Sequence, residues 1–333
     1  MSQQNISSEF DVHVFSSGMR LLHKKSSGPV SHLAIVIKAG SRDEQEEEQG
    51  LAHYVEHCLF KGTRHRKTYH ILSRLDDVGG ELNAFTGKED TTLYATVLKK
   101  DYGRAADLLL DIAFHSTFPE REILKEKEVI ADEIDSYRDS PSDHIFDLFD
   151  EQLFPDHPLG RNILGTRESL RSFDRTDLTS FVSRLYRPEN IILASSGQLS
   201  LPQVLRAWSK AIPAAIESHS SPDRIPPLSY SPSATDLSRE QVQTHCIMGN
   251  RAYPSGHDNA LALYVVNNIL GGPTMNNRLN LNIRERYGLT YNLESFYSPM
   301  SDTGTWGVYL STDPGYAERV IQLVYRELKQ LRE

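Results

Sequence analysis

The sequence is poor in cysteine and has no long apolar run, and each shortage excludes a class of protein. Its two cysteines, Cys58 and Cys246, cannot form a disulfide framework, which is typical of proteins kept in a reducing compartment. No segment approaches the length that spans a bilayer, and the N-terminal stretch MSQQNISSEFDVHVF lacks the basic region and apolar run of a secretion signal. We therefore expect a soluble, cytoplasmic protein that does not enter a membrane.

Basic residues are outnumbered by acidic ones. With 36 lysines and arginines against 45 aspartates and glutamates, the net charge at pH 7 is −9. No basic stretch offsets this balance, which argues against a general nucleic-acid-binding protein. The 333 residues, 38% of them hydrophobic, are sufficient to fill two cores, whereas a single core of this size would be unusual.

The stretch GLAHYVEHCLFKG, residues 50–62, carries the strongest chemical signal. As an α-helix it places His53, Glu56 and His57 on one face, because residues three and four apart are neighbours on a helix surface. Apolar residues cover the other directions, which predicts a helix surrounded by protein. Two imidazoles and a carboxylate buried in this way need partners, and a divalent metal ion would satisfy all three.

The order of these three residues, His-x-x-Glu-His, is the reverse of the His-Glu-x-x-His pattern of many zinc proteases. Histidines at i and i+4 can bind one zinc ion, while the glutamate lies near the metal and is free to handle the proton of a water molecule. The alternative is a solvated helix face with a helix-supporting charge pair. Because the surroundings are apolar, we interpret His53 and His57 as zinc ligands.

A third zinc ligand is expected on a later helix. Thr117-x-x-Glu120 predicts a capping box that opens a helix running to about Asp139. Glu126 and Glu133 fall on the flank of its apolar stripe, where a carboxylate needs a positive partner. We predict that Glu133 completes a His-His-Glu zinc site and that Glu126 orients one of the histidines. Ion pairs with nearby lysines and arginines are the alternative for both glutamates.

These motifs resemble those of a known family. HYVEH, followed by the glutamate of EKEVIADE, is similar to the zinc motif of the pitrilysin family of metallopeptidases, especially the branch that contains the β subunit of mitochondrial processing peptidase. Further matches are AGSRDE, CLFKGT, GGELNAFTGKEDTTLY and LGGPTMNNRLNLNIRERYGLTY, which occur in the family's order through nearly the whole chain. The resemblance implies a peptidase with His53, His57 and Glu133 as zinc ligands and Glu56 as the general base.

The resemblance also assigns a role to the segment Glu81–Thr86. This segment and Thr91–Leu98 are predicted strands around a polar turn, and in the family the first of them lies beside the zinc and pairs with the substrate backbone. An exposed strand edge can hold any extended peptide through its N–H and C=O groups. We expect Asn83 and Ala84 at this contact, although the sequence alone favours an ordinary paired hairpin strand equally.

The first half, residues 1–212, is predicted to be an α+β domain of the metallopeptidase type, with a mostly antiparallel sheet packed with helices. The acidic run at residues 43–48 suits the dipole at the start of the zinc helix, but a solvated loop explains it equally well. The other strands are expected at residues 11–15, 19–24, 32–39 and 190–196, and the other helices at residues 69–78, 101–115, 146–154, 166–172, 176–186 and 200–212.

The second half, residues 239–333, repeats this plan without the zinc ligands. Residues 260–265 are apolar where the histidines would stand, so we expect zinc in the first half alone. Residues 213–238 are rich in Ser, Pro and Ala and are predicted to be an interdomain linker. The second repeat is expected to be incomplete, with the natural protein extending about 70 to 100 residues further. Its predicted elements are strands at 242–249, 291–299 and 304–312 and helices at 257–270 and 316–331.

The motif RERYGLTY in the second half contains Arg284 and Tyr291. The resemblance implies that an arginine and a tyrosine at this spacing reach the active site, where an oxyanion needs a cation and a phenol donor. Alternatively, Arg284 forms a surface ion pair and Tyr291 packs within a strand. The segment Gly271-Gly272-Pro273-Thr274 departs from the family's more uniform glycine stretch, which leaves open how this loop meets a substrate.

Together these patterns predict a zinc-dependent endopeptidase that cleaves extended or unfolded peptides with a metal-activated water. The expected partner is a peptide substrate, and the chain acts alone, as a homodimer or as a heterodimer with a paralogous subunit. Because the resembling family includes catalytically silent members, a scaffold subunit is the alternative function. The intact HxxEH motif and Glu133 argue against that alternative.

Overall fold

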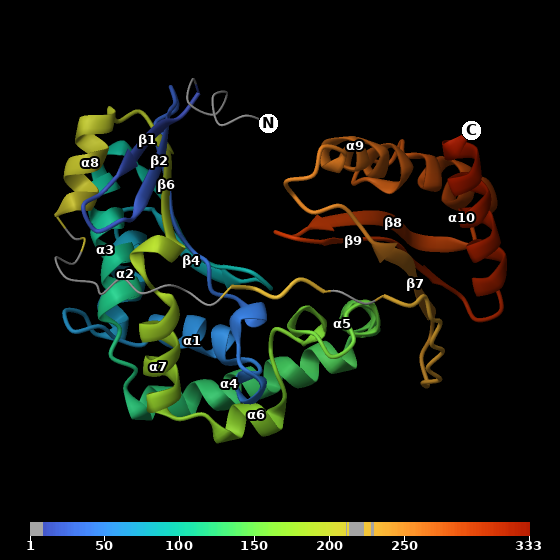
Figure 1. Cartoon of the computed structure of the whole chain (residues 1–333), viewed down its shortest axis with the longest axis horizontal. Helices are drawn as coiled ribbons and strands as arrows, with labels where there is room; N and C mark the ends of the chain where they lie inside the picture. Colours follow the sequence, from blue (N-terminus) through green and yellow to red (C-terminus); the bar gives the residue numbers. More distant parts are fainter. Residues whose placement is uncertain (1–8, 211, 213–222, 228–229) are drawn as a thin grey trace. The chain divides into compact units, whose positions relative to one another are not determined.

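Contacts between residues divide the chain into two compact units. The structure is a computed structural model that describes residues 9–210, 212, 223–227 and 230–333 (Figure 1). One unit comprises Met1–Asp135 and Arg161–Arg224, and the other comprises Ser136–Gly160 and Ile225–Glu333. The chain therefore crosses between the units three times, and the first crossing, between Asp135 and Ser136, falls within helix α4 (Glu120–Asp139).

The first unit is built on a six-stranded sheet in the order β1-β2-β6-β3-β5-β4. Neighbouring strands are antiparallel except β2 and β6, which are parallel. Every second residue along β3 and β6 is buried, because alternate side chains of a strand point to the same face. The strands are β1 (Asp11–Val14), β2 (Arg20–Lys25), β3 (Val30–Ile37), β4 (Glu81–Thr86), β5 (Thr91–Leu98) and β6 (Ile191–Gly197).

Helices of the first unit enclose one hydrophobic core with this sheet. Helix α3 (Tyr102–His115) packs on β3 and β5, whereas α1 (Leu51–Leu59) packs on β4 and on α7 (Arg175–Leu185). The remaining helices are α2 (Thr68–Asp76), α6 (Arg167–Ser172) and α8 (Leu201–Ser209), with single 3-10 turns at Ser41–Asp43, Glu46–Glu48, Lys99–Asp101 and Pro188–Asn190.

Helix α1 is surrounded by protein, as its apolar composition predicts. Seven of its nine residues are buried. Its start is fixed by Gly50, whose φ of 91° lies in the left-handed region and whose added Cβ would lie 2.5 Å from the Leu164 carbonyl oxygen. The buried Glu44 carboxyl caps the helix, accepting hydrogen bonds from Gly50 N at 3.1 Å and from Ala52 N at 2.8 Å.

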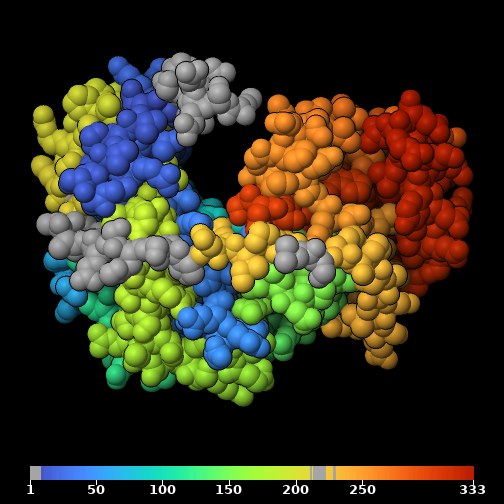
Figure 2. Space-filling model, viewed as in Figure 1, coloured from blue at the N-terminus to red at the C-terminus, as the bar shows by residue number. Residues whose placement is uncertain are grey.

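The second unit has a three-stranded antiparallel sheet in the order β7-β9-β8 and its own core. Helix α5 (Pro141–Leu153) packs against β7. Figure 2 shows α9 and α10, coloured orange to red, on the surface of this unit. Its elements are β7 (Thr244–Arg251), α9 (Ala260–Gly271), a short π-helix (Asn280–Glu285), β8 (Thr290–Pro299), β9 (Gly304–Thr312) and α10 (Ala317–Arg332), and a 3-10 turn covers Pro158–Gly160.

The order of elements confirms the predicted α+β fold and its repeat. Strands β7, β9 and β8 are neighbours in the second sheet as β3, β5 and β4 are in the first, and α9 and α10 stand in the chain where α1 and α3 do. Helix α9 carries no histidine, cysteine or acidic residue, whereas α1 carries two histidines and a glutamate.

The division into units differs from the predicted boundaries at one segment. Residues 136–160, predicted within the first domain, belong to the second unit, because Phe146 and Phe149 of α5 pack against Phe296 of β8. The predicted linker, residues 213–238, lies partly outside the described residues. Among the residues that are described, no helix combines the length and apolar composition needed to cross a bilayer.

The predicted capping box at the start of α4 does not form. The helix begins at Glu120, and the Thr117 hydroxyl instead donates a hydrogen bond to the Gly62 carbonyl at 3.2 Å. Phe118 between them has a φ of 47°, so the backbone turns before the helix begins. Within the first turn of the helix, the N–H groups of Glu122 and Ile123 donate hydrogen bonds to the Pro119 carbonyl.

Candidate metal centre

Glu133 on α4 lies beside the two histidines of α1. Its Oε2 atom is 3.5 Å from His57 Nε2 and 3.8 Å from His53 Nε2. One ligand atom from each of the three residues lies within 4.8 Å of the others. Helix α4 runs alongside α1 (Figure 1), and the Tyr54 hydroxyl joins the two helices by donating to the Ile123 carbonyl at 2.7 Å. The structure therefore brings together the three residues predicted to bind zinc.

The donor set and its spacing fit a zinc ion. Nitrogen and oxygen ligands in a tetrahedron around zinc lie about 3.4 Å from one another, which is close to both distances measured from Glu133. Burial and the neighbouring His57 lower the pKa of His53 to about 3. At pH 7 the His53 imidazole is therefore neutral, and its lone pair is available for a metal.

Glu126, which was predicted to orient one of the histidines, contacts the other ring nitrogen of His57. The Glu126 Oε2 atom is 3.2 Å from His57 Nδ1, and its Oε1 atom is 2.7 Å from Lys61 Nζ. A carboxylate in this place fixes the tautomer of a metal-binding histidine and directs Nε2 toward the metal. His53 differs, because its Nδ1 is buried without a hydrogen-bond partner among the described residues.

Glu56, the predicted general base, is held by a residue that the sequence did not single out. The Thr86 hydroxyl donates a hydrogen bond to Glu56 Oε2 at 2.8 Å. Burial raises the pKa of the Glu56 carboxyl, while this hydrogen bond and His57 act in the opposite direction. The sequence did give one indication of this contact, because Thr86 is the last residue of the strand predicted to lie beside the zinc.

Asn83 and Ala84 lie on β4, which is the last strand of the first sheet. β4 pairs with β5 on one side, and no described strand pairs with its other side. The strand also packs on α1, the helix that carries the histidines. Its free edge is thus of the kind that can add an extended peptide as a further strand.

Arg284 and Tyr291 belong to the second unit, where they contact each other. The Arg284 guanidinium lies over the Tyr291 ring, 5.0 Å from the ring centroid, and also donates to Asn280 Oδ1 at 3.0 Å. The side chain of Tyr291 is exposed. Their predicted role at the metal stays a prediction.

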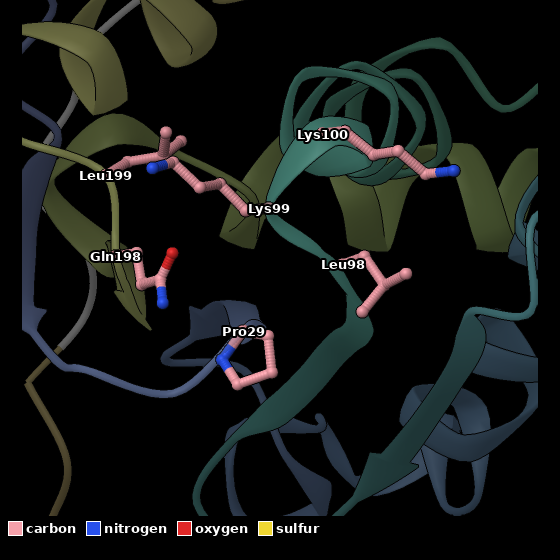
Figure 3. Close-up of a pocket in the computed structure, with 6 residues that line it drawn as sticks. All are labelled: Pro29, Leu98, Lys99, Lys100, Gln198 and Leu199. Atoms are coloured by element: carbon pink, nitrogen blue, oxygen red, sulfur yellow. The ribbon is translucent and has the colours of Figure 1, made fainter.

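A pocket of about 510 Å³ in the first unit involves none of the predicted site residues. It lies where β5 ends and where β3 is about to begin (Figure 3). Its two charged side chains are lysines, and the Lys99 side chain extends toward Leu199. Its lining contains no histidine, cysteine or acidic residue, which are the usual ligands of zinc, so this pocket offers no alternative metal centre.

Two family models match the chain. The model described as insulinase (peptidase family M16) matches residues 20–167, and the model described as peptidase M16 inactive domain matches residues 172–333. A protein of Bacillus subtilis named as an uncharacterized zinc protease is 33% identical over 303 residues, covering 90% of this chain and 73% of its own. A zinc protease of Rickettsia felis with the same description is 34% identical over 295 residues, covering 89% and 70%.

Solved structures share this fold. A peptidase M16 inactive domain from Pseudomonas fluorescens superposes with a TM-score of 0.90 at 19% identity, over 96% of this chain and 78% of that one. A protease from Helicobacter pylori superposes with a TM-score of 0.88, also at 19% identity, over 96% and 79%. At this level of identity the likeness concerns the fold alone.

Proposed function

The chain belongs to the M16 peptidase family, and from this premise we propose that it is a zinc-dependent endopeptidase that cleaves extended or unfolded peptides. The observation that carries the proposal is the convergence of His53, His57 and Glu133, whose ligand atoms lie within 4.8 Å of one another. Relatives in Bacillus subtilis and Rickettsia felis that are named as zinc proteases support the same metal.

Each side chain of the centre has one task in this proposal. His53, His57 and Glu133 hold zinc, and Glu126 orients His57 through its Nδ1 atom at 3.2 Å. When bound, zinc supplies a Lewis acid that polarises the scissile carbonyl and lowers the pKa of water. Glu56 accepts the proton of the attacking water and passes it to the leaving amine.

The substrate binds in an extended conformation along β4. The free edge of this strand at Asn83 and Ala84 supports the proposal, because unpaired N–H and C=O groups hold a backbone without reading its side chains. A folded substrate cannot offer a free strand of this kind, so unfolded or short peptides are preferred. Arg284 and Tyr291, which contact each other, are proposed to stabilise the oxyanion of the tetrahedral intermediate.

The proposal is tested by measuring zinc content and cleavage of a denatured, fluorescently labelled protein by the purified chain. We expect about one zinc ion in this centre and cleavage by the chain alone. Glu56→Gln should keep the zinc and lose about 100-fold or more of the cleavage rate, because general-base catalysis is worth that much. His53→Ala and Glu133→Gln should lose both zinc and cleavage.

Two results would count against the proposal. Cleavage by Glu56→Gln at the normal rate would remove Glu56 from the role of general base. Zinc binding without cleavage by the unaltered chain would favour a silent scaffold or a subunit that needs a paralogous partner. If adding a purified paralogous subunit then restores cleavage, the chain is a subunit that needs a partner. If cleavage stays absent, the chain is a silent scaffold.

A further inference from the structure

A second group of metal-ligating side chains lies in the first unit and takes no part in the proposed function. His65, Asp111 and His115 each offer a ligand atom within 4.8 Å of those of the other two. Asp111 and His115 share a face of α3, because they are four residues apart. His65 lies in the loop between α1 and α2.

The loop that carries His65 is fixed to the end of α3 by its backbone. Thr63 forms a β-bridge with Ser116, and Arg64 N donates to the His115 carbonyl at 2.9 Å. Within the loop, the Thr63 hydroxyl oxygen accepts hydrogen bonds from His65 N at 3.1 Å and from Arg66 N at 2.9 Å. The three side chains are therefore held together before any ligand arrives.

The two oxygens of the Asp111 carboxylate have different partners. Oδ2 accepts from the Thr63 hydroxyl at 2.7 Å and from Arg66 Nη1 at 2.5 Å. Oδ1 faces the two imidazoles, with His65 Nδ1 at 2.6 Å and His115 Nδ1 at 3.2 Å. Thr63 and Arg66 thus orient the carboxylate and leave Oδ1 directed at two nitrogens that can bind a metal.

The charges around the cluster admit a cation. Asp111 is 3% exposed, and although burial opposes its ionisation, hydrogen bonds from His65, Thr63 and Arg66 hold its pKa below the ordinary value. The Arg66 guanidinium is also bound by Asp107 at 2.5 Å. One arginine is therefore opposed by two carboxylates, so the cluster keeps a net negative charge when both imidazoles are neutral.

We propose that His65, Asp111 and His115 form a second site for a divalent cation of the zinc class. Zinc, cobalt and nickel bind well to a set of two imidazoles and one carboxylate, whereas calcium and magnesium prefer sites made of oxygen ligands alone. The 3.2 Å between His115 and Asp111 is near the spacing of about 3.4 Å between tetrahedral zinc ligands. His65 must withdraw by about 0.8 Å to reach that spacing, which its 58% exposed side chain permits.

The ion would connect two segments that help to position the proposed active site. The loop of His65 follows α1, which carries His53, Glu56 and His57, and α3 packs on the central strands. A cation held by side chains from both segments binds the folded chain and not the unfolded one. It therefore stabilises the folded state in proportion to its concentration, without entering the proposed reaction.

The test uses the untagged full chain, stripped of metal and titrated with Zn²⁺ alone against a chromophoric chelator. The unaltered chain should bind two equivalents, and the double variant His65→Gln with His115→Gln should bind one while keeping its peptidase activity. His53→Ala should also bind one equivalent, now at the second site, so a failure of the first site is distinguished from a failure of the second. His70→Gln, at an exposed histidine on α2, is the matched control and should bind two.

Thermal unfolding supplies a second measurement. Zinc added beyond the first equivalent should raise the melting temperature of the unaltered chain and of His70→Gln, but not that of the double variant. If the double variant does not fold, His65→Gln alone removes one exposed ligand and should weaken the second equivalent at least 10-fold. One equivalent in the unaltered chain, or two in the double variant, would overturn the proposal.

Discussion

Thr86 Oγ1 donates a hydrogen bond to Glu56 Oε2 at 2.8 Å, which joins the last residue of β4 to the helix that carries the histidines. Burial raises the pKa of the Glu56 carboxyl, whereas the hydrogen bond from Thr86 lowers it and so favours the ionised form that a general base needs. Because β4 is also the proposed substrate strand, one residue would link the position of the peptide to the orientation of the general base. Thr86 is thus a positioning residue for the proposed reaction.

We expect Thr86→Val to lower kcat about 10-fold or more, since a hydrogen bond to a charged group is worth about 1.5–3 kcal/mol. The side chain keeps its shape and β4 keeps its backbone, so KM and zinc content should change little. Steady-state kinetics on a fluorogenic peptide measure the two constants. Thr86→Ser retains the hydroxyl and should restore kcat, whereas equal rates in the Val and Ser variants would show that the hydroxyl has no such role.

The chemistry of α1 and α4 was accessible from the sequence because helical periodicity is local. The spacing of His53, Glu56 and His57 fixed a common face, and a carboxylate on an apolar stripe indicated that Glu133 turned inward. The structure brings these residues together, with Glu133 Oε2 at 3.5 Å from His57 Nε2. The edge position of β4 also agrees with the sequence prediction.

Contacts between distant segments were not accessible in this way. Glu44 lies in an acidic run that the sequence could not distinguish from a solvated loop, yet its carboxyl is buried and caps α1. Nothing in the local pattern of α5 shows that Phe146 packs on Phe296, which places residues 136–160 in the second unit. Side-chain hydrogen bonds such as that of Thr86 depend on the pairing of whole elements, and no single stretch encodes them.

Glu126→Gln should weaken zinc binding about 10- to 100-fold, because Glu126 orients His57 and its carboxylate also binds Lys61 at 2.7 Å. The glutamine keeps the size of the side chain but loses the charge that favours a donating Nδ1–H. Competition with a chelator of known affinity measures the change. Glu128→Gln alters an exposed glutamate of the same helix and should leave the affinity unchanged. The same loss in both variants would point to a general effect of charge on α4.

Tyr291→Phe should lower kcat about 10- to 100-fold with unchanged zinc content, if its phenol donates to the oxyanion as proposed. The substitution removes one hydroxyl and keeps the ring that lies 5.0 Å from the Arg284 guanidinium. The comparison is Tyr325→Phe, at an exposed tyrosine of α10, which should cleave at the normal rate. Unchanged kcat in Tyr291→Phe would leave Tyr291 as a surface residue that supports Arg284.

The Glu44 carboxyl should make the stability of the chain depend on pH. Burial, the largest influence, raises the pKa of Glu44 from 4.5 to about 8, although the N–H groups of Ala52 and Gly50 act against it. Between pH 4.5 and pH 8 the folded chain therefore holds a proton that the unfolded chain has released. Raising the pH through this window favours the unfolded state, and the free energy of unfolding falls by up to about 1.4 kcal/mol per pH unit.

Urea unfolding at pH 5, 6, 7 and 8 measures this effect as the difference between the unaltered chain and Glu44→Gln. The glutamine keeps an oxygen that can accept from the N–H groups at the start of α1, but it has no proton to release. The stability of the unaltered chain relative to Glu44→Gln should therefore decrease steadily from pH 5 to pH 8. Glu46→Gln, at an exposed position of the same acidic run, should show no such trend. A difference that stays constant over the four pH values would mean that Glu44 is ionised in the folded chain and caps α1 as a carboxylate.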